Sequence, residues 1–295
     1  MTQVATVAQT SNPERKVPTR RMSFEESMAD LPRAFAADGD LISGHVIMAL
    51  SSVFPDGEDY FVRSVRHYRD QITDPALKRQ VAGFIGQEAV HGREHRVFNG
   101  RLAELGYPTK KYERFTKAGL RFRERILPPV SNLAATAALE HFTATLAELV
   151  LTNEEIRDLM GADAVRDLFV WHALEESEHK AVAFDVYKAV GGGERLRVWT
   201  MNFFRFGFVL GMGLAVVLSL LGDKATYRDG NLRRSWRRLK ASPLADPAIW
   251  AQLKDYNRPG FHPDDSDTTA LVESWRFTLF GEDGTLNDKL IGGAA

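Results

Sequence analysis

The sequence contains no cysteine among its 295 residues. Disulfide bonds, iron–sulfur clusters, thiolate zinc sites and cysteine nucleophiles are therefore excluded. Any metal ion must be bound through nitrogen and oxygen atoms. A site built from imidazole and carboxylate groups suits iron, with manganese and zinc as alternatives.

The sequence also lacks an excess of charge of either sign, with 38 Lys and Arg residues against 39 Asp and Glu residues. This balance provides no electrostatic footprint for a nucleic acid, so we expect no nucleic-acid partner. The polar residues 1–21 lack the apolar run of a signal peptide. We interpret them as a flexible tail on a cytoplasmic protein.

Runs with the alternation of β-strands are absent too, and helical periodicity dominates, which predicts an all-α fold. A turn at residues 54–57 precedes a helix at 58–69, and Asp74-Pro75 begins a helix that ends near Leu105. Residues 109–129 are interpreted as a basic connection. Helices at 131–151 and 164–190 follow, the latter ended by three glycines.

One segment, residues 206–222, has no charged side chain. Its 17 residues are at the short limit for crossing a bilayer, so we predict a helix buried in the core or in a homodimer interface. Peripheral contact with a membrane is the alternative. Together with Phe203 and Phe204, this segment could also form the wall of a pocket for a hydrophobic substrate.

Two Glu-x-x-His pairs occur, Glu88 with His91 and Glu176 with His179. Residues i and i+3 lie on one face of a helix, so each pair can direct a carboxylate and an imidazole toward one point. Either pair alone is weak support for a metal site, because an exposed Glu and His on a helix surface give the same pattern.

The spacing of two further glutamates strengthens the metal interpretation. Glu140 lies in an apolar, alanine-rich stretch where an unpaired charge is costly, and Glu58 precedes the first pair. The intervals between the four glutamates are short, long and short, as two antiparallel helix pairs joined by one long crossover require. Dinuclear carboxylate bundles use one Glu from each of two helices and Glu-x-x-His from each of the other two. The six positions here are Glu58, Glu88, His91, Glu140, Glu176 and His179.

With these six positions the sequence resembles the ferritin-like di-iron superfamily. It resembles more closely a bacterial family named "predicted metal-dependent hydrolase", through residues 54–58 (FPDGE), 87–91 (QEAVH), 175–179 (EESEH) and 258–263 (RPGFHP). The superfamily resemblance implies two iron ions and oxygen-dependent hydroxylation, desaturation or N-oxygenation of a small organic substrate, with an external electron donor. The family name implies hydrolysis. The implied organisation is a ferritin-like bundle at 22–195, an apolar helix at 196–225 and a peripheral helical extension at 226–295.

Four further residues complete the predicted site. His172 precedes Glu176 by one turn, and the resulting pattern is similar to that of di-iron arylamine N-oxygenases, in which the first histidine is an additional ligand. A hydrogen-bonding or surface histidine is the alternative for His172. Gln87 and Glu175 are candidates to orient the ligand histidines. His95 is expected to lie near the site without binding metal.

Competing interpretations remain open from the sequence alone. His91, Glu94 and His95 form an H-x-x-E-H motif, which in zinc peptidases binds one zinc and activates water. A bundle that stores iron or manganese without catalysis fits the same ligands. An absence of any metal would leave the buried Glu140 unexplained.

Overall fold

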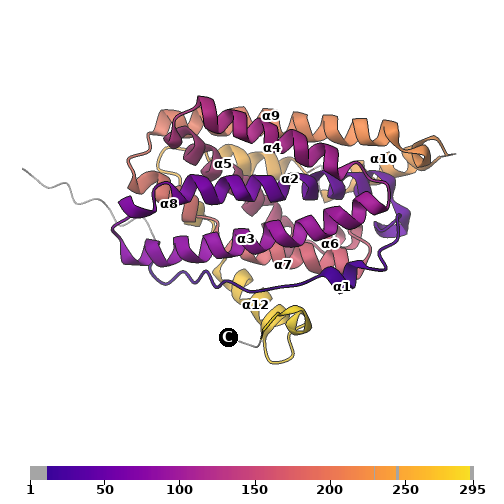
Figure 1. The fold of residues 1–295 in the computed structure, drawn as a ribbon, viewed down its shortest axis with the longest axis horizontal. Coiled ribbons are helices and arrows are strands. Elements are labelled where there is room, and N and C mark those ends of the chain that lie inside the picture. The colour runs from indigo at the N-terminus through magenta and orange to yellow at the C-terminus, as the bar shows by residue number, and fades with distance from the viewer. Residues whose placement is uncertain (1–11, 229, 244–245, 293–295) are drawn as a thin grey trace, which may run out of the picture.

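The computed structural model describes residues 12–228, 230–243 and 246–292. Within these ranges the fold is all-α, as predicted, and the one β-bridge joins Met22 to Leu290. Two long helix pairs form the centre of the molecule (Figure 1). The first pair is α2 (Leu41–Arg66) with α3 (Pro75–Glu104), and the second is α5 (Pro129–Thr152) with α7 (Asp163–His179). Short helices α1 (Glu25–Met28) and α6 (Glu154–Leu159) lie at the ends of the pairs.

The turn predicted at residues 54–57 is wrong, because α2 continues through Pro55. Proline lacks the N–H that would bond to the carbonyl four residues earlier, here that of Ser51. The side chain of Asn99, on α3, donates from Nδ2 to this carbonyl oxygen at 3.0 Å. A tertiary contact therefore satisfies the group that the proline leaves without a helical partner.

The basic connection predicted at residues 109–129 is itself helical, since it folds as helix α4 (Thr109–Ile126). Lys and Arg are good helix formers, and α4 has a half-buried side that packs on α2 while its charged side faces solvent. It is this helix that carries the chain from the first helix pair to the second. The single helix predicted at 164–190 is divided into α7 and α8 (Val182–Ala189).

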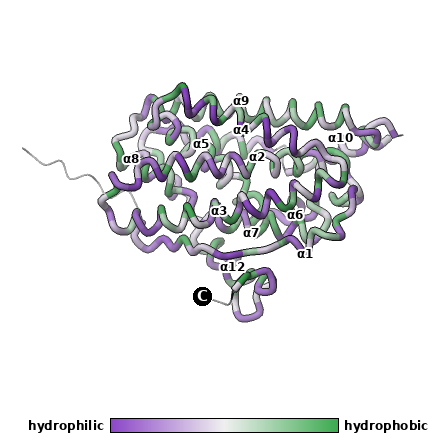
Figure 2. The backbone as a smooth tube through the Cα atoms, in the orientation of Figure 1, coloured by the Kyte–Doolittle hydropathy of each residue, from purple (hydrophilic) through white to green (hydrophobic). Residues whose placement is uncertain are grey.

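The apolar segment belongs to α9 (Glu194–Gly222), which lies along the outside of α2 and α5. Figure 2 shows hydrophobic residues along this helix. By length and composition α9 could cross a membrane, yet only 11% of its most apolar window is buried. The prediction of a core-buried helix is therefore wrong.

The N-terminal tail prediction also needs correction where residues 12–21 are described. This segment runs across α3, and Val17 and Thr19 lie directly over Gly83 and Gly86, where any side chain would collide with them. Arg20 contacts buried glutamates of α7. Residues 1–11 of the predicted tail lie outside the described part of the chain.

The C-terminal region contains α10 (Asn231–Ala241), α11 (Pro247–Asp255) and α12 (Thr269–Phe280). Its packing is close, because Tyr256 is fully buried and its carbonyl accepts a hydrogen bond from the buried Arg197 of α9. Apolar core residues form two clusters. All four central helices contribute to the first, whereas α2, α3 and α5 form the second together with α8 and α9. Buried polar side chains lie between these clusters in the middle of the bundle.

Candidate metal centre

The four central helices bring all seven predicted ligand residues together in the interior. Each has a relative exposure of 4% or less. Six of them form two groups of three, and within each group the ligand atoms lie within 4.8 Å of one another. Glu140 lies beside the second group. The first group contains Glu58, His91 and His172, and the second contains Glu88, Glu176 and His179.

The sequence suggested that each Glu-x-x-His pair directs both of its side chains toward one point. The structure does not show this for the first pair, Glu88 and His91. Glu88 lies with His179, and the distance from Oε1 of Glu88 to Nε2 of His179 is 3.1 Å. His91 lies instead with His172. Three residues advance a helix by about 4.5 Å along its axis. Glu88 and His91 therefore reach two different groups that follow each other along the bundle, whereas Glu176 and His179 belong to the same group.

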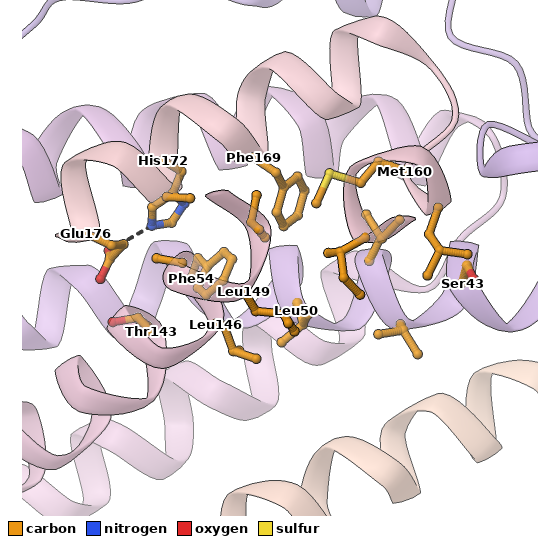
Figure 3. A pocket seen from close by; sticks show the side chains of 17 residues that line it. Ser43, Leu50, Phe54, Thr143, Leu146, Leu149, Met160, Phe169, His172 and Glu176 are labelled. Carbon is orange, nitrogen blue, oxygen red and sulfur yellow. Dashed lines mark hydrogen bonds and ion pairs between the residues drawn. The ribbon is translucent and has the colours of Figure 1, made fainter. Parts of the chain in front are cut away.

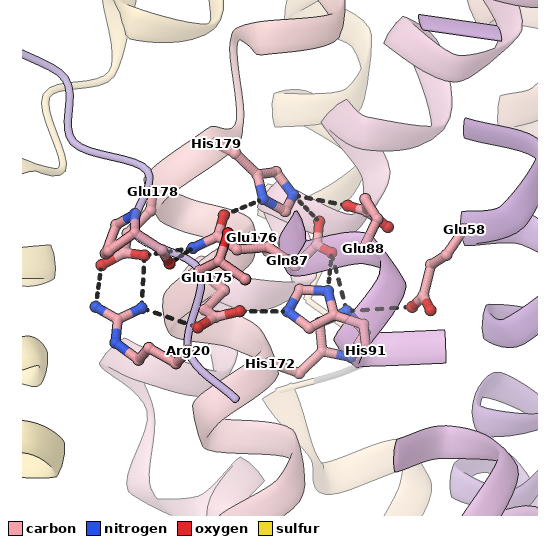
Figure 4. Close-up of polar contacts among 12 residues, drawn as sticks. Arg20, Glu58, Gln87, Glu88, His91, His172, Glu175, Glu176, Glu178 and His179 are labelled. Carbon is pink, nitrogen blue, oxygen red and sulfur yellow. Dashed lines mark hydrogen bonds and ion pairs between the residues drawn. The ribbon is translucent and has the colours of Figure 1, made fainter. Parts of the chain in front are cut away.

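Glu176 connects the two groups. Its Oε1 lies 2.9 Å from Nε2 of His172 and 3.7 Å from Nδ1 of His91, while its Oε2 lies 3.5 Å from Nε2 of His179. One carboxylate thus turns one oxygen toward each group, so Glu176 lies between the two groups. Figure 4 shows these side chains converging from α3 and α7, with Glu58 approaching from α2.

Nine buried atoms in this centre have no hydrogen-bond partner among the described residues. Unpartnered buried polar atoms are rare in folded proteins and each costs free energy. Here they all belong to candidate ligands, so a cation bound in each group would give them partners. They are both carboxylate oxygens of Glu58, Glu88 and Glu140, Oε2 of Glu176, Nδ1 of His91 and Nε2 of His179.

Electrostatics point the same way. Burial, reinforced by the charges of Glu88 and Glu176, raises the pKa of Glu58 and of Glu140 well above the usual range. Burial would lower the pKa of His179, but the surrounding carboxylates raise it well above its usual range. A proton is retained where the carboxylates attract positive charge, and a metal ion would satisfy the same attraction.

The hydrogen bonds of Gln87 and Glu175 determine which nitrogen of two histidines faces the centre. The amide nitrogen of Gln87 donates to Glu178 at 2.7 Å and to a backbone carbonyl, so its Oε1 accepts from Nδ1 of His179 at 2.9 Å. Glu175 accepts from Nε2 of His91 at 3.0 Å. The nitrogen left facing the centre is Nε2 of His179 and Nδ1 of His91. A cation that replaced the proton on His179 would find a lone pair there, as in metal-binding histidines.

A longer chain of hydrogen bonds orients His172. Asn99 uses its amide hydrogens on Glu113 and on the Ser51 carbonyl, so its Oδ1 accepts from the Ser51 hydroxyl at 2.7 Å. Ser51 must then accept from Nδ1 of His95 at 2.8 Å. Nε2 of a neutral His95 accepts in turn from Nδ1 of His172 at 2.7 Å. His172 is left with a lone pair on Nε2 facing two carboxylates, an arrangement that a cation between them stabilises.

A ring of charges outside the centre was missed by sequence reasoning. Arg20 donates to Glu175 at 2.9 Å and to Glu178 at 2.7 and 2.8 Å, and Arg276 of α12 also donates to Glu178. The position of Glu178 beside the second Glu-x-x-His pair was a usable signal. Nothing in the local sequence indicated that arginines from the two ends of the chain would neutralise the glutamates that hold the site.

The competing H-x-x-E-H zinc motif is not assembled. Glu94 accepts hydrogen bonds from the backbone N–H of Phe24 and from Arg93, and both nitrogens of His95 are engaged by Ser51 and His172. His91 and His95 therefore do not present two free nitrogens to one zinc with Glu94 beside it.

A family model described as predicted metal-dependent hydrolase matches residues 18–267. The chain belongs to this family. The match includes all seven ligand candidates as well as Arg20. No curated protein and no solved structure gives a significant match to the chain.

Two apolar cavities reach the centre. A cavity of about 100 Å³ ends at His172 and Glu176 (Figure 3). Apart from Ser43 and Thr143, its other lining residues are apolar, such as Phe54 and Phe169. A larger one, of about 690 Å³, lies between α4, α9 and the bundle and reaches Glu58 and Glu176. Phe204 and Phe208 of α9 lie on its wall.

Proposed function

We propose that this protein is a metal-dependent enzyme with two metal ions in the four-helix centre, and that it hydrolyses an apolar organic substrate. The observation that carries the proposal is the set of nine unpartnered ligand atoms in two adjacent groups. Membership of the predicted metal-dependent hydrolase family supports hydrolysis. The order of the ligand helices supports a ferritin-like bundle as the scaffold.

Each ion would have its own ligands and share Glu176. Glu58, His91 and His172 would hold one ion, and Glu88, Glu140 and His179 the other. All these donors are nitrogen or oxygen, which suits iron, manganese or zinc. Such a pair of ions supplies Lewis acidity and an activated water, and a pair of iron ions can also activate dioxygen.

The chain itself supplies substrate position and a dry environment. The larger cavity has few polar side chains besides Glu58, Glu176 and Lys111, so it favours a hydrophobic substrate with its reactive group at the two glutamates. Gln87 and Glu175 keep the imidazole protons on the outer nitrogens. Arg20 and Arg276 neutralise the outer carboxylates without entering the ligand set.

A second candidate is an oxidoreductase that uses dioxygen and an external electron donor. The observation favouring it is the ligand set itself, in which histidines and four carboxylates from four helices line an apolar cavity. Storage of metal without catalysis is less well supported, because a substrate-sized apolar cavity ends at the ligands.

The metal content of the purified protein tests the dinuclear centre first. We expect elemental analysis of the purified protein to give two metal ions per chain, and Glu140→Ala to retain one or none. Glu148→Ala, further along the same helix and outside the ligand groups, is the matched control and should retain two. A protein that binds no metal after reconstitution with iron, manganese or zinc would refute the dinuclear centre.

The metal-loaded forms are then compared in two assays. Zinc-loaded protein that cleaves p-nitrophenyl esters, with rates that increase with acyl length, supports hydrolysis of apolar substrates. Activity confined to the iron-loaded form, with oxygen uptake that requires a reductant, supports the oxidoreductase. Neither activity in any loaded form, with metal bound, would favour storage.

A further inference from the structure

Helix α9 carries a continuous apolar stripe that faces away from the protein. Phe206, Leu210 and Leu214 lie on this stripe at intervals of four residues, and all are exposed, Leu210 to 75%. The opposite side of the helix, with Phe208 and Met212, is half-buried against the bundle. Helix α9 therefore lies flat on the bundle, and most of its apolar surface is not covered by the protein.

Exposed hydrophobic side chains from neighbouring helices extend this surface. Helix α4 contacts α9 through a hydrogen bond of 2.8 Å from the Tyr112 hydroxyl to the Ala215 carbonyl. On α4, Phe115 and Phe122 are exposed. Exposed tryptophans lie on α9 and on two neighbouring helices. Tryptophan is concentrated where a bilayer meets water. These exposed tryptophans are Trp199 of α9, Trp236 of α10 and Trp250 of α11.

Positive charge surrounds the same surface. Helix α4 contains seven Lys and Arg residues and two Glu residues, and α10 contains five Lys and Arg residues and no acidic residue. The whole chain, in contrast, has a formal net charge of −1. Figure 1 shows α4 along α9 and α10 at its C-terminal end. A cavity lined jointly by α9 and α10 places these two helices together.

We propose that the surface formed by α4, α9 and α10 docks on a lipid bilayer that contains anionic lipids, with α9 parallel to the membrane plane. An apolar helix face with basic flanks is the pattern of a protein that lies in the interface without crossing it. Packing of α9 along α2 and α5 excludes a spanning orientation for the folded protein. Anionic headgroups complement the basic helices, whereas a second copy of this surface would bring like charges together.

The position of the larger cavity gives this docking a consequence. Exposed residues of α4 and α9, among them Phe115 and Leu218, form its rim, and Glu58 lies at its inner end. A hydrophobic molecule dissolved in the bilayer could therefore enter from the docked face. The docking itself requires no assumption about the reaction at the metal centre.

Vesicle co-sedimentation of the full-length protein tests the proposal. We expect binding to vesicles of phosphatidylcholine mixed with phosphatidylglycerol, weaker binding to phosphatidylcholine alone, and a decrease at high salt. Leu210→Glu should weaken binding about tenfold or more, since it removes an inserted apolar side chain and adds a negative charge. Arg234→Gln with Arg237→Gln should weaken it about thirtyfold, at about fivefold for each charge.

Matched variants on other faces control for changes in folding. Phe277→Glu alters a side chain that is also 75% exposed, on α12 at the opposite edge of the molecule (Figure 1). Lys78→Gln with Arg79→Gln removes two exposed charges from α3. Both controls should bind vesicles as the unaltered protein does.

Two results would overturn the proposal. One is equal binding of all variants, or no binding to either vesicle type. The other is a stable dimer in sedimentation analysis that Leu210→Glu converts to a monomer, with no vesicle binding, because a second copy would then cover this surface. Metal content measured on the same variants keeps this outcome separate from a failure of the metal centre.

Discussion

Removal of the Arg20 side chain tests whether the N-terminal segment is part of the folded core. This guanidinium is 10% exposed and is hydrogen-bonded to Glu175 and Glu178, whose side chains are fully buried. Arg20→Met keeps an unbranched apolar side chain in place of the arginine stem and removes the guanidinium and its charge. Breaking a buried ion pair typically costs about 3–5 kcal/mol, because the partner is left charged without compensation.

The structure indicates a value near the lower limit for this variant. Glu178 keeps Arg276 as a partner, so Glu175 is the carboxylate left without a cation. Burial already raises the pKa of Glu175, and Arg20 opposes that effect. Without Arg20 the pKa of Glu175 would rise further, and easier protonation of this carboxylate limits the loss. We expect the free energy of unfolding to fall by about 3 kcal/mol.

Urea denaturation of the metal-free protein, followed by circular dichroism, measures this change. Arg276→Met is the matched control and should cost about 1 kcal/mol, because Arg276 is more exposed and Glu178 retains Arg20. Adding Glu175→Gln to Arg20→Met should recover most of the loss, since no buried charge then remains unpaired. A loss below about 1 kcal/mol for Arg20→Met would refute this reasoning and would mean that the segment is a loosely held tail.

Two further predictions concern residues that are not themselves candidate ligands. Asn99→Leu leaves the Ser51 carbonyl without a donor and should destabilise the protein by about 1–3 kcal/mol in thermal or urea unfolding. In a Pro55→Ala background a helical N–H is restored, so Asn99→Leu should cost less. Equal costs in the two backgrounds would contradict our account of α2. The pair of His262 and Asp185, 2.7 Å apart, should make stability pH-dependent. Burial lowers the pKa of His262, but the Asp185 carboxylate raises it overall, so the pair's contribution is complete below the unfolded pKa of about 6.5 and is lost as pH rises through the folded pKa. The stability difference between the protein and a His262→Gln variant should therefore decrease on going from pH 6 to higher pH, and a difference that increases would refute the pairing.

Helix identity was largely predictable from the sequence, whereas helix boundaries were not wherever tertiary contacts override local signals. The start of α3 followed from an Asp-Pro signal, and its end from glycine and proline. Pro55 gave an equally clear local signal for a turn, but a side chain from α3 compensates for the missing hydrogen bond. No local pattern around Pro55 contains that information, because Asn99 is 44 residues away in the chain.

The candidate ligands were also predictable, because their chemistry constrains their spacing. Carboxylates and imidazoles at helical intervals, including one in an alanine-rich stretch, are costly in a core unless something binds them. The sequence could not show that Glu88 and His91 belong to different groups, since that depends on how far each helix is shifted along its neighbours.

The sequence by itself determined an all-α chain without thiolate ligands, and it predicted carboxylate and imidazole residues as the candidates to bind metal. The tertiary structure decided which ligands meet, because that depends on the axial positions of four packed helices. It also decided that Arg20 and Arg276 neutralise the outer glutamates and that α9 remains on the surface, since both follow from long-range packing of segments whose local sequences allow other arrangements.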